Sequence, residues 1–369
     1  MIYLDHGATS FPKPASVGRA MMDAMMRYGN PGRGGYPAAM KGAEVVYECR
    51  KDASGLFECD PEQVVFTSGC THGLNMAIRT LFQAGDRVLI SGFEHNAVTR
   101  ALHGLGCKII VAGRRLFDWE NTLEEFEKAL NSGADGAVFT QVSNVFGYIL
   151  PVAELAWMCR EKGIPFIVDA AQSAGTMKVS LKELGADFIA MPGHKGLLGP
   201  MGTGLLLCGR LPEPLLMGGT GSESKNQAMP DFLPDRGEAG TLNVPGIAGL
   251  GAAIRYLQRV GIDKIGMREK KLALQCAAGL RELGFQVFFG EHQAGTVSFV
   301  PWMDCEEGAA ILAREGIAVR AGLHCAPLAH ESAGTLETGT IRISFGAEGN
   351  MAQIKALLQA ASKLRPSGG

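Results

Sequence analysis

The chain has 369 residues, of which 46% are hydrophobic and 20% are charged, and its formal net charge is −2. This length and composition predict a globular protein with a sizeable core, built as two domains or as one large α/β domain with a smaller appendage. The near-neutral charge argues against a nucleic-acid binder. No apolar run approaches the ~20 residues of a membrane-spanning helix, and the N-terminal residues lack the features of a signal peptide.

The nine cysteines are scattered along the chain, and no Cys-x-x-Cys pair occurs. An odd number without regular spacing argues against a disulfide framework or a structural zinc site. No group of histidines, cysteines and carboxylates has the spacing of a metal site. We therefore expect no metal and a cytoplasmic location, with most thiols acting as small core side chains.

Short apolar runs alternate with amphipathic stretches in the first part of the chain. Seven of these runs predict strands, at 64–67, 87–91, 108–112, 137–142, 166–170, 188–192 and 204–208. Their nearly continuous apolarity is typical of strands buried on both faces in a mostly parallel sheet. Helices are predicted between several of them, for example at 122–131 and 152–162.

The pattern changes after residue 240. Helices are predicted at 246–260, 263–283 and 351–363, and strands at 296–300 and 340–345. Segment 212–238, rich in Gly, Pro, Ser and Met, indicates an irregular connection, and 365–369 a frayed end. We predict a division into an N-terminal arm that packs with the small domain, a large cofactor-binding domain and a small α+β domain, at 1–15, 16–245 and 246–369.

Polar residues follow three of the predicted strands, at the edge where open α/β sheets bind ligands. Segment 68–75 is a small, polar turn that opens a helix, and the free amides there suit a phosphate, although a capped turn is an equal alternative. Asp169 ends an apolar run, where a carboxylate is costly without a cation or donors. Lys195 follows its strand among glycines. The alternatives are a helix N-cap for Asp169 and a solvated turn for Lys195.

These three features fit one cofactor, pyridoxal 5'-phosphate (PLP). It needs a lysine for covalent attachment, a carboxylate that keeps its ring nitrogen protonated, and a donor-rich cradle for its phosphate. Lys195, Asp169 and the turn at 68–75 together therefore predict a PLP enzyme. A nicotinamide dehydrogenase, which a parallel sheet alone would permit, is disfavoured because no GxGxxG motif follows the first strand.

Short sequence motifs that occur together, in a fixed order, are spread over almost the whole chain. They are Tyr3-Leu4-Asp5 with Ala8-Thr9, Asn30-Pro31 with Arg33-Gly34, 69–75, Glu94-His95, 143–147, 169–172, Gly193-His194-Lys195, 238–243, 320–326 and Arg342-Ile343-Ser344. Through them the chain resembles the class V aminotransferase group of fold-type I PLP enzymes, and most closely the cysteine desulfurases of the group II, SUF-like kind. The resemblance implies an α/β fold-type I PLP-dependent transferase, whose large domain holds a seven-stranded, mostly parallel sheet beside a smaller C-terminal α+β domain.

The resemblance also implies a role for each matching residue. The implied catalytic residues are Lys195, Cys325 and His95. The implied cofactor-binding residues are Lys195, Asp169 at the ring nitrogen, Gln172 at the phenolic oxygen, His95 on the ring face, Asn144, and, at the phosphate, Thr71, His72, His194 and Thr241. Thr241 would act across a homodimer interface. The implied substrate-binding residues are Arg342, Asn144 and Ala8, with Arg342 as a bidentate fork for the carboxylate.

Cys325 distinguishes the activity within this group. The resemblance implies an L-cysteine desulfurase, in which the Cys325 thiolate takes the substrate sulfur, alanine leaves, and the persulfide passes to a sulfur-acceptor protein, as in iron–sulfur cluster assembly. A free thiol is mostly protonated at neutral pH, so attack needs a base or cationic surroundings, for which His324 and Arg320 are candidates. Selenocysteine lyase and a PLP-dependent aminotransferase or C–S lyase for another small amino acid are the alternatives.

Two further features bear on these expectations. The short stretch between Cys325 and Arg342 favours a restrained cysteine loop that hands sulfur to a docked acceptor. Cys70 stands where a hydroxyl residue is common, which predicts a weaker phosphate bond there. The role of His6 is open. The side chains of His72, His103, His292 and His330 are interpreted as structural or surface groups.

Overall fold

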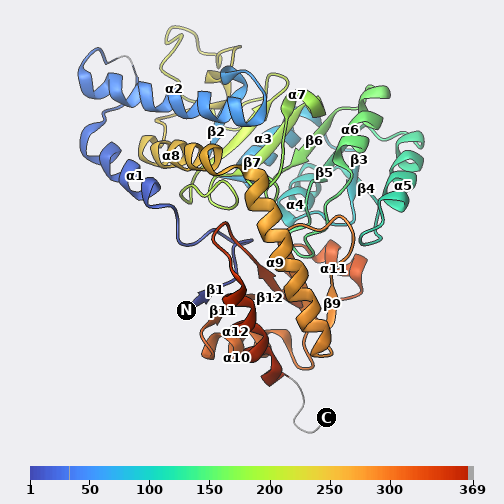
Figure 1. Ribbon diagram of the computed structural model, residues 1–369. Helices are drawn as coiled ribbons and strands as arrows, with labels where there is room; N and C mark the ends of the chain where they lie inside the picture. The colour runs from blue at the N-terminus through green and yellow to red at the C-terminus, as the bar shows by residue number, and fades with distance from the viewer. Residues whose placement is uncertain (33, 365–369) are drawn as a thin grey trace.

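A computed structural model describes residues 1–32 and 34–364. Arg33 of the Arg33-Gly34 motif and the end predicted to fray, 365–369, lie outside the described residues. A larger part built around a sheet lies above a smaller one in Figure 1, and the long helix α9 (Ile262–Glu282) runs down from the larger part along the smaller one. Each of the nine cysteines is a free thiol.

The large sheet has seven strands, in the order β2-β8-β7-β6-β5-β3-β4. Their bounds are β2 (Val64–Thr67), β3 (Arg87–Ser91), β4 (Lys108–Ala112), β5 (Gly136–Thr140), β6 (Phe166–Asp169), β7 (Phe188–Pro192) and β8 (Gly204–Cys208). Only β8 runs antiparallel, to both of its neighbours. The predicted seven-stranded, mostly parallel α/β sheet is therefore confirmed, with β5 ending two residues before its predicted end.

Side chains alternate across this sheet because successive residues of a strand point to opposite faces. Leu89 and Phe139 belong to one core, which α5 and α6 share, whereas Val88 and Val138 belong to the other, which α3 and α4 share. The helices between the strands are η1 (Pro61–Gln63), α3 (Cys70–Leu81), α4 (Asn96–Leu105), α5 (Trp119–Asn131), α6 (Val152–Glu161) and α7 (Leu181–Leu184). Both faces of the sheet are covered, which explains the near-continuous apolarity of its strands.

Three helices form a layer beside the first core: α1 (Ala15–Arg27), α2 (Pro37–Phe57) and α8 (Val244–Val260). Close approach is possible because α8 carries glycines at the contacts. A Cβ atom on Gly249 would lie 2.7 Å from Met21 Cγ, and one on Gly251 would lie 3.2 Å from Cys49 Cβ. Since α8 packs with the large domain, we propose that the division between the domains falls near Gly261 and not before residue 246.

The smaller part is built on an antiparallel sheet in the order β12-β13-β10-β9. Its strands are β9 (Gln286–Phe288), β10 (Thr296–Val300), β12 (Arg320–Gly322) and β13 (Thr340–Ser344), and its helices besides α9 are α10 (Cys305–Arg314), α11 (Pro327–Ala333), α12 (Met351–Ala361) and η3 (Ser362–Leu364). Residues from α9, α10 and α12 share one core with this sheet. The strands and helices predicted here from the sequence are confirmed, with shifts of a few residues at their ends.

The N-terminal arm lies against the small domain. Its strand β1 (Ile2–Tyr3) pairs in parallel with β11 (Ile317–Ala318), and Leu4 is buried in the small-domain core. Segment 212–238 is irregular, and its single helical turn is η2 (Asp235–Gly237). None of the described helices is both long and apolar enough to span a membrane.

Candidate active site

A cavity of about 360 Å³ opens beside the carboxyl ends of β5, β6 and β7. Most of the residues implied as cofactor ligands line it together: Thr71, His72, His95, Asn144, Asp169, Gln172, His194 and Lys195. They come from several loops and helix starts because parallel strands bring successive strand ends to one edge of the sheet. The sequence therefore predicted the location of this cavity and most of its lining.

Lys195 and Asp169 are the two charged groups at its centre. Asp169 is buried and the Lys195 side chain is half-buried, and desolvation lowers the pKa of the Lys195 ammonium, although the nearby Asp169 opposes this shift. Asp169 Oδ1 accepts hydrogen bonds from the Ala171 amide at 2.8 Å and from the Cys70 thiol at 3.4 Å. No cation of the described chain forms an ion pair with Asp169, so its carboxylate is available to a cationic group of a ligand.

Cys70 makes a contact that the sequence did not indicate, because its thiol donates to Asp169. The weaker phosphate bond expected at this position stays a prediction. Burial and the adjacent carboxylate raise the pKa of Cys70 well above the usual thiol range. The thiol accordingly stays protonated and acts as a donor to the buried acid.

The first turn of α3 forms part of the wall of the cavity, through Cys70, Thr71 and His72. No side chain caps this helix at Gly69, and within the described residues the amides of Cys70, Thr71 and His72 make no hydrogen bond. The His72 ring turns back to accept from the Ser68 amide at 3.2 Å. Free amides at a helix start favour a phosphate or a carboxylate, and the phosphate position itself stays a prediction.

His95 caps the next helix, α4. Its Nδ1 accepts a hydrogen bond from the Ala97 amide at 3.0 Å, and burial lowers the pKa of the ring. The ring is therefore neutral, with its proton on Nε2. A neutral imidazole that lines the cavity can accept or donate a proton near neutral pH without carrying a fixed charge.

The N-terminal arm closes one side of the site. Gln172 Nε2 donates to the Gly7 carbonyl at 3.0 Å, and the His194 carbonyl accepts from Ser10 Oγ at 3.1 Å and from Lys13 Nζ at 2.6 Å. Burial, with Lys195 and Lys13 nearby, lowers the pKa of the His194 ring to about 4, so the ring is neutral. Ala8 lies in the arm, where its amide donates to the Asp5 carbonyl at 3.1 Å, and it is not among the residues that line the cavity.

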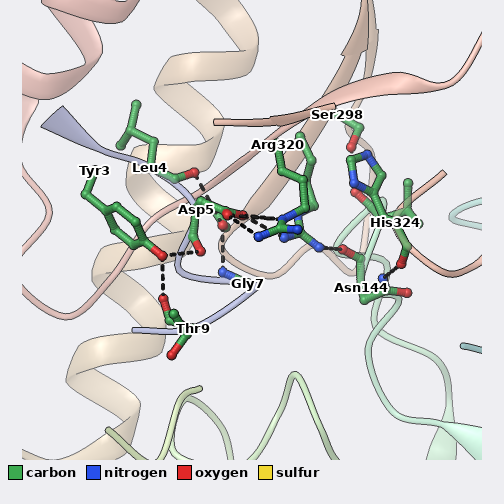
Figure 2. Close-up of polar contacts among 12 residues, drawn as sticks. Tyr3, Leu4, Asp5, Gly7, Thr9, Asn144, Ser298, Arg320 and His324 are labelled. Carbon is green, nitrogen blue, oxygen red and sulfur yellow. Dashed lines mark hydrogen bonds and ion pairs between the residues drawn. The ribbon is translucent and has the colours of Figure 1, made fainter. Parts of the chain in front are cut away.

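Asp5 links two arginines of the small domain (Figure 2). It accepts from Arg342 Nη2 at 2.8 Å and from Arg320 Nη2 at 2.9 Å. Arg342 is buried and also donates from Nη1 to the Asn144 carbonyl at 3.0 Å, whereas its Nε has no partner in the described chain. The guanidinium is thus fixed beside the cavity with N–H groups to spare for an anion. The sequence contained Asp5 in a motif but gave it no role.

Cys325 lies on a loop that is fastened to the cavity on two sides. Its carbonyl accepts from the Asn96 amide at 2.8 Å, directly after His95, and the His324 carbonyl accepts from Asn144 Nδ2 at 2.8 Å. His324 and Cys325 adopt left-handed φ angles of 50° and 56°, and Cys325 is exposed. The loop is therefore short and restrained, as the spacing to Arg342 predicted.

The surroundings of the thiol supply a cation but no charged histidine. The hydrogen bond to Asp5 is the main cause that raises the pKa of Arg320, and Cys325 makes a smaller electrostatic contribution, so a charged guanidinium belongs to the surroundings of the thiol. The His324 ring instead contacts Thr340 Oγ1 at 3.2 Å, and burial lowers its pKa. Of the two groups suggested by the sequence, Arg320 is the one that provides positive charge.

Thr241 lies in an adjoining cavity of about 570 Å³, which Thr71 and His72 of the same chain also line. Its expected contact with a neighbouring subunit stays a prediction. Among the described residues, no group of three or more His, Cys, Asp or Glu side chains could hold a metal ion.

The chain belongs to the class-V aminotransferase family, whose model matches residues 2–357. Its fold is that of the fold-type I enzymes, and the solved structures that it resembles include a cysteine desulfurase from Thermococcus onnurineus, with a TM-score of 0.90, 34% identity and coverage of 98% of this chain and 94% of that one.

Its relatives in sequence have similar names. A probable cysteine desulfurase from Pyrococcus abyssi is 35% identical and covers 97% of this chain and 92% of its own, and one from Methanothermobacter thermautotrophicus is 34% identical over 93% of this chain and 90% of its own. The solved cysteine desulfurase CsdA from Escherichia coli has a TM-score of 0.86 and 26% identity, with coverage of 98% of this chain and 94% of that one.

Proposed function

We propose that this chain is a PLP-dependent L-cysteine desulfurase that forms alanine and a persulfide on Cys325. The observation that carries the proposal is the double attachment of the Cys325 loop, at the lining residue Asn144 and at Asn96, which directly follows the lining residue His95. The Cys325 thiol is exposed, and its loop holds two residues with left-handed φ angles near a cavity that is lined by Lys195 and Asp169. These features favour a reactive thiol over an inert core thiol.

The residues present fit PLP. Lys195 would hold it through its amine, Asp169 would face the ring nitrogen, and the free amides at the start of α3 would hold the phosphate. When bound, PLP supplies an electron sink for the bonds at the substrate Cα. The lowered pKa of Lys195 favours the neutral amine, which is the form that reacts with a carbonyl and that removes the Cα proton.

The remaining residues place the substrate and take its sulfur. The guanidinium of Arg342, held by Asp5, would bind the cysteine carboxylate with its free N–H groups. The Cys325 thiolate, with Arg320 nearby, would attack the substrate sulfur, so that an S–S bond forms as the C–S bond breaks. The carbon keeps the electron pair and takes up a proton, which yields alanine and the Cys325 persulfide.

We further propose a homodimer in which Thr241 reaches the partner's phosphate, a sulfur-acceptor protein that docks at exposed Cys325, and a cytoplasmic location. The exposure of Cys325 supports the acceptor. The nine free thiols favour a reducing compartment.

The test uses the purified protein loaded with PLP. Exposure to L-cysteine should add one sulfur atom to the peptide that contains Cys325, detected by mass spectrometry. Cys325→Ser should abolish alanine formation while the absorbance of the bound cofactor persists. Lys195→Ala should lose covalent labelling by borohydride. Unchanged alanine formation in Cys325→Ser, or keto acid and ammonia as products, would contradict the proposal.

A further inference from the structure

A second, smaller cavity lies behind Lys195. It measures about 40 Å³ and shares three wall residues with the cofactor cavity, namely Val142, Gln172 and Lys195. Polar groups of the arm and of the small domain also line it, among them His6 and Ser344. The lining is mixed, and a space of this size can hold roughly three water molecules at its polar groups. Lys195 therefore borders a second space, besides the cofactor cavity, that is large enough for water.

Glu269 of α9 lines this inner cavity as well. Its side chain is buried, and burial alone raises its pKa, to about 8. Within the described chain it forms no ion pair, and it packs so closely on Gly295 that a Cβ atom there would lie 2.9 Å from Glu269 Oε2. A buried carboxylate without a partner is costly, so the folded protein keeps the Glu269 carboxyl protonated up to about pH 8.

Glu269 differs in this from the other buried glutamate with a raised pKa. Glu94 also has a pKa of about 8, but its Oε1 accepts from Ser91 Oγ at 2.5 Å and from the Thr140 amide at 2.8 Å. Glu94 therefore has a structural role between two strands. No such hydrogen bonds hold Glu269, whose carboxyl is free to exchange its proton.

A third cavity, of about 370 Å³, continues from Glu269 to the surface. It shares four wall residues with the inner cavity: Thr176, Glu269, Ala294 and Gly295. Exposed side chains of α9, namely Asp263, Met267 and Lys270, form its outer wall. The three cavities thus lie in series, with Lys195 between the first and second and Glu269 between the second and third.

We propose that Glu269 is a proton-relay residue that exchanges the proton of Lys195 with solvent through water in the inner cavity. The proposal rests on the proposed function, in which Lys195 takes the Cα proton of the substrate. The Lys195 ammonium gives a proton to the water, the water gives one to the Glu269 carboxylate, and the carboxylic acid gives it to solvent in the outer cavity. Each step moves one proton, and no other bond changes.

The titratable groups that line these cavities are few. His6 of the arm is neutral, because burial lowers its pKa to about 4. Lys195 lies at the inner end, and Asp263 and Lys270 lie at the outer end. Glu269 is thus the group between Lys195 and solvent that changes charge near neutral pH, as an efficient acid–base group must.

The experiment follows a deuterium label through one turnover. The PLP-loaded enzyme converts L-[2-²H]cysteine in ordinary water, and mass spectrometry measures the deuterium retained at Cα of alanine. Loss of the relay in Glu269→Gln should slow exchange on Lys195 by about tenfold or more, so that more of the label returns to alanine. Glu282→Gln, an exposed change on the same helix, should match the wild type.

The outcomes of these experiments distinguish a failure of the proposed relay from a failure of the proposed function. Equal retention in Glu269→Gln and wild type, with normal alanine yield, overturns the relay, whereas no alanine from the wild type overturns the proposed function. Infrared titration of the cofactor-free protein should show carboxylic acid signal that is lost near pH 8, and Glu269→Gln should lack the part due to Glu269 and keep the part due to Glu94. If that variant does not fold, the wild-type enzyme alone tests the relay. Deuterium retention in its alanine should fall as the pH rises through about 8, because the Glu269 carboxylate that then forms can accept a proton. Retention that does not depend on pH contradicts the proposal.

Discussion

Arg342 and Arg320 share one carboxylate but differ in what else they contact. Arg342 is buried and also binds the Asn144 carbonyl, whereas half of the Arg320 side chain is exposed. Asp5 fixes both guanidinium groups, and only Arg342 adjoins a lining residue of the cofactor cavity through a hydrogen bond. Arg342 is therefore the position at which to test carboxylate binding, and Arg320 is the matched control.

Arg342→Lys should raise KM for L-cysteine by about 10- to 100-fold, because lysine cannot hold Asp5, the Asn144 carbonyl and a carboxylate at once. Steady-state kinetics measures this. Arg320→Lys, which keeps a cation near Cys325, should leave KM within about threefold of the wild type. A similar rise of KM in both variants would assign the effect to the Asp5 cluster and not to carboxylate binding.

At the scale of elements, the contact of α8 with α1 depends on Gly249. A Cβ atom there would lie 2.7 Å from Met21 Cγ, so Gly249→Val should lower the free energy of unfolding by about 1–3 kcal/mol through overpacking. Gly18 of α1 has no atom within 4 Å of its Cβ position, so Gly18→Ala should raise it by about 0.5–1 kcal/mol. Urea unfolding measures both, and opposite signs are the expected result.

The loop of Cys325 gives a second prediction at this scale. Asn144→Ala removes the hydrogen bond to the His324 carbonyl and should free the two residues with left-handed backbone. Alkylation of Cys325 by iodoacetamide in the cofactor-free protein should then become faster, as followed by peptide mass spectrometry. An unchanged rate would show that the Asn96 contact alone restrains the loop.

The sequence predicted those elements that carry a local signal. The seven strands of the large sheet were recognised because each is an apolar run with a turn after it. Asp169 was singled out because it ends such a run, and Lys195 because it follows one among glycines. Strands β1 and β11 have two residues each and no such pattern. The links from Asp5 to Arg342 and from Cys70 to Asp169 join distant segments, so no spacing in the sequence indicates them.

At the scale of the whole molecule, buried carboxyl groups make stability depend on pH. The pKa of Glu269 rises from 4.5 to about 8 on folding, so the folded state binds more protons between these values. Its contribution is therefore fully present below about pH 4.5 and is lost as the pH rises through 8, at about 1.4 kcal/mol per pH unit within that window.

Glu269→Gln removes this dependence. Its free energy of unfolding relative to the wild type should increase between pH 5 and pH 8 at roughly the slope given by one proton. Urea unfolding of the cofactor-free proteins at several pH values measures the difference. A constant difference over this range would mean that the Glu269 carboxyl ionises in the folded protein as it does in water.

The pairing of Asp5 with Arg342 also sets an order of events during synthesis. The two residues are 337 positions apart, and β13 leaves the ribosome long after the strands that carry Asp169 and Lys195. The nascent large domain can thus assemble its cofactor pocket while the first residues still lack their partner strands. With Arg342 as the proposed carboxylate ligand, recognition of the amino acid would be the last capability that the growing polypeptide acquires.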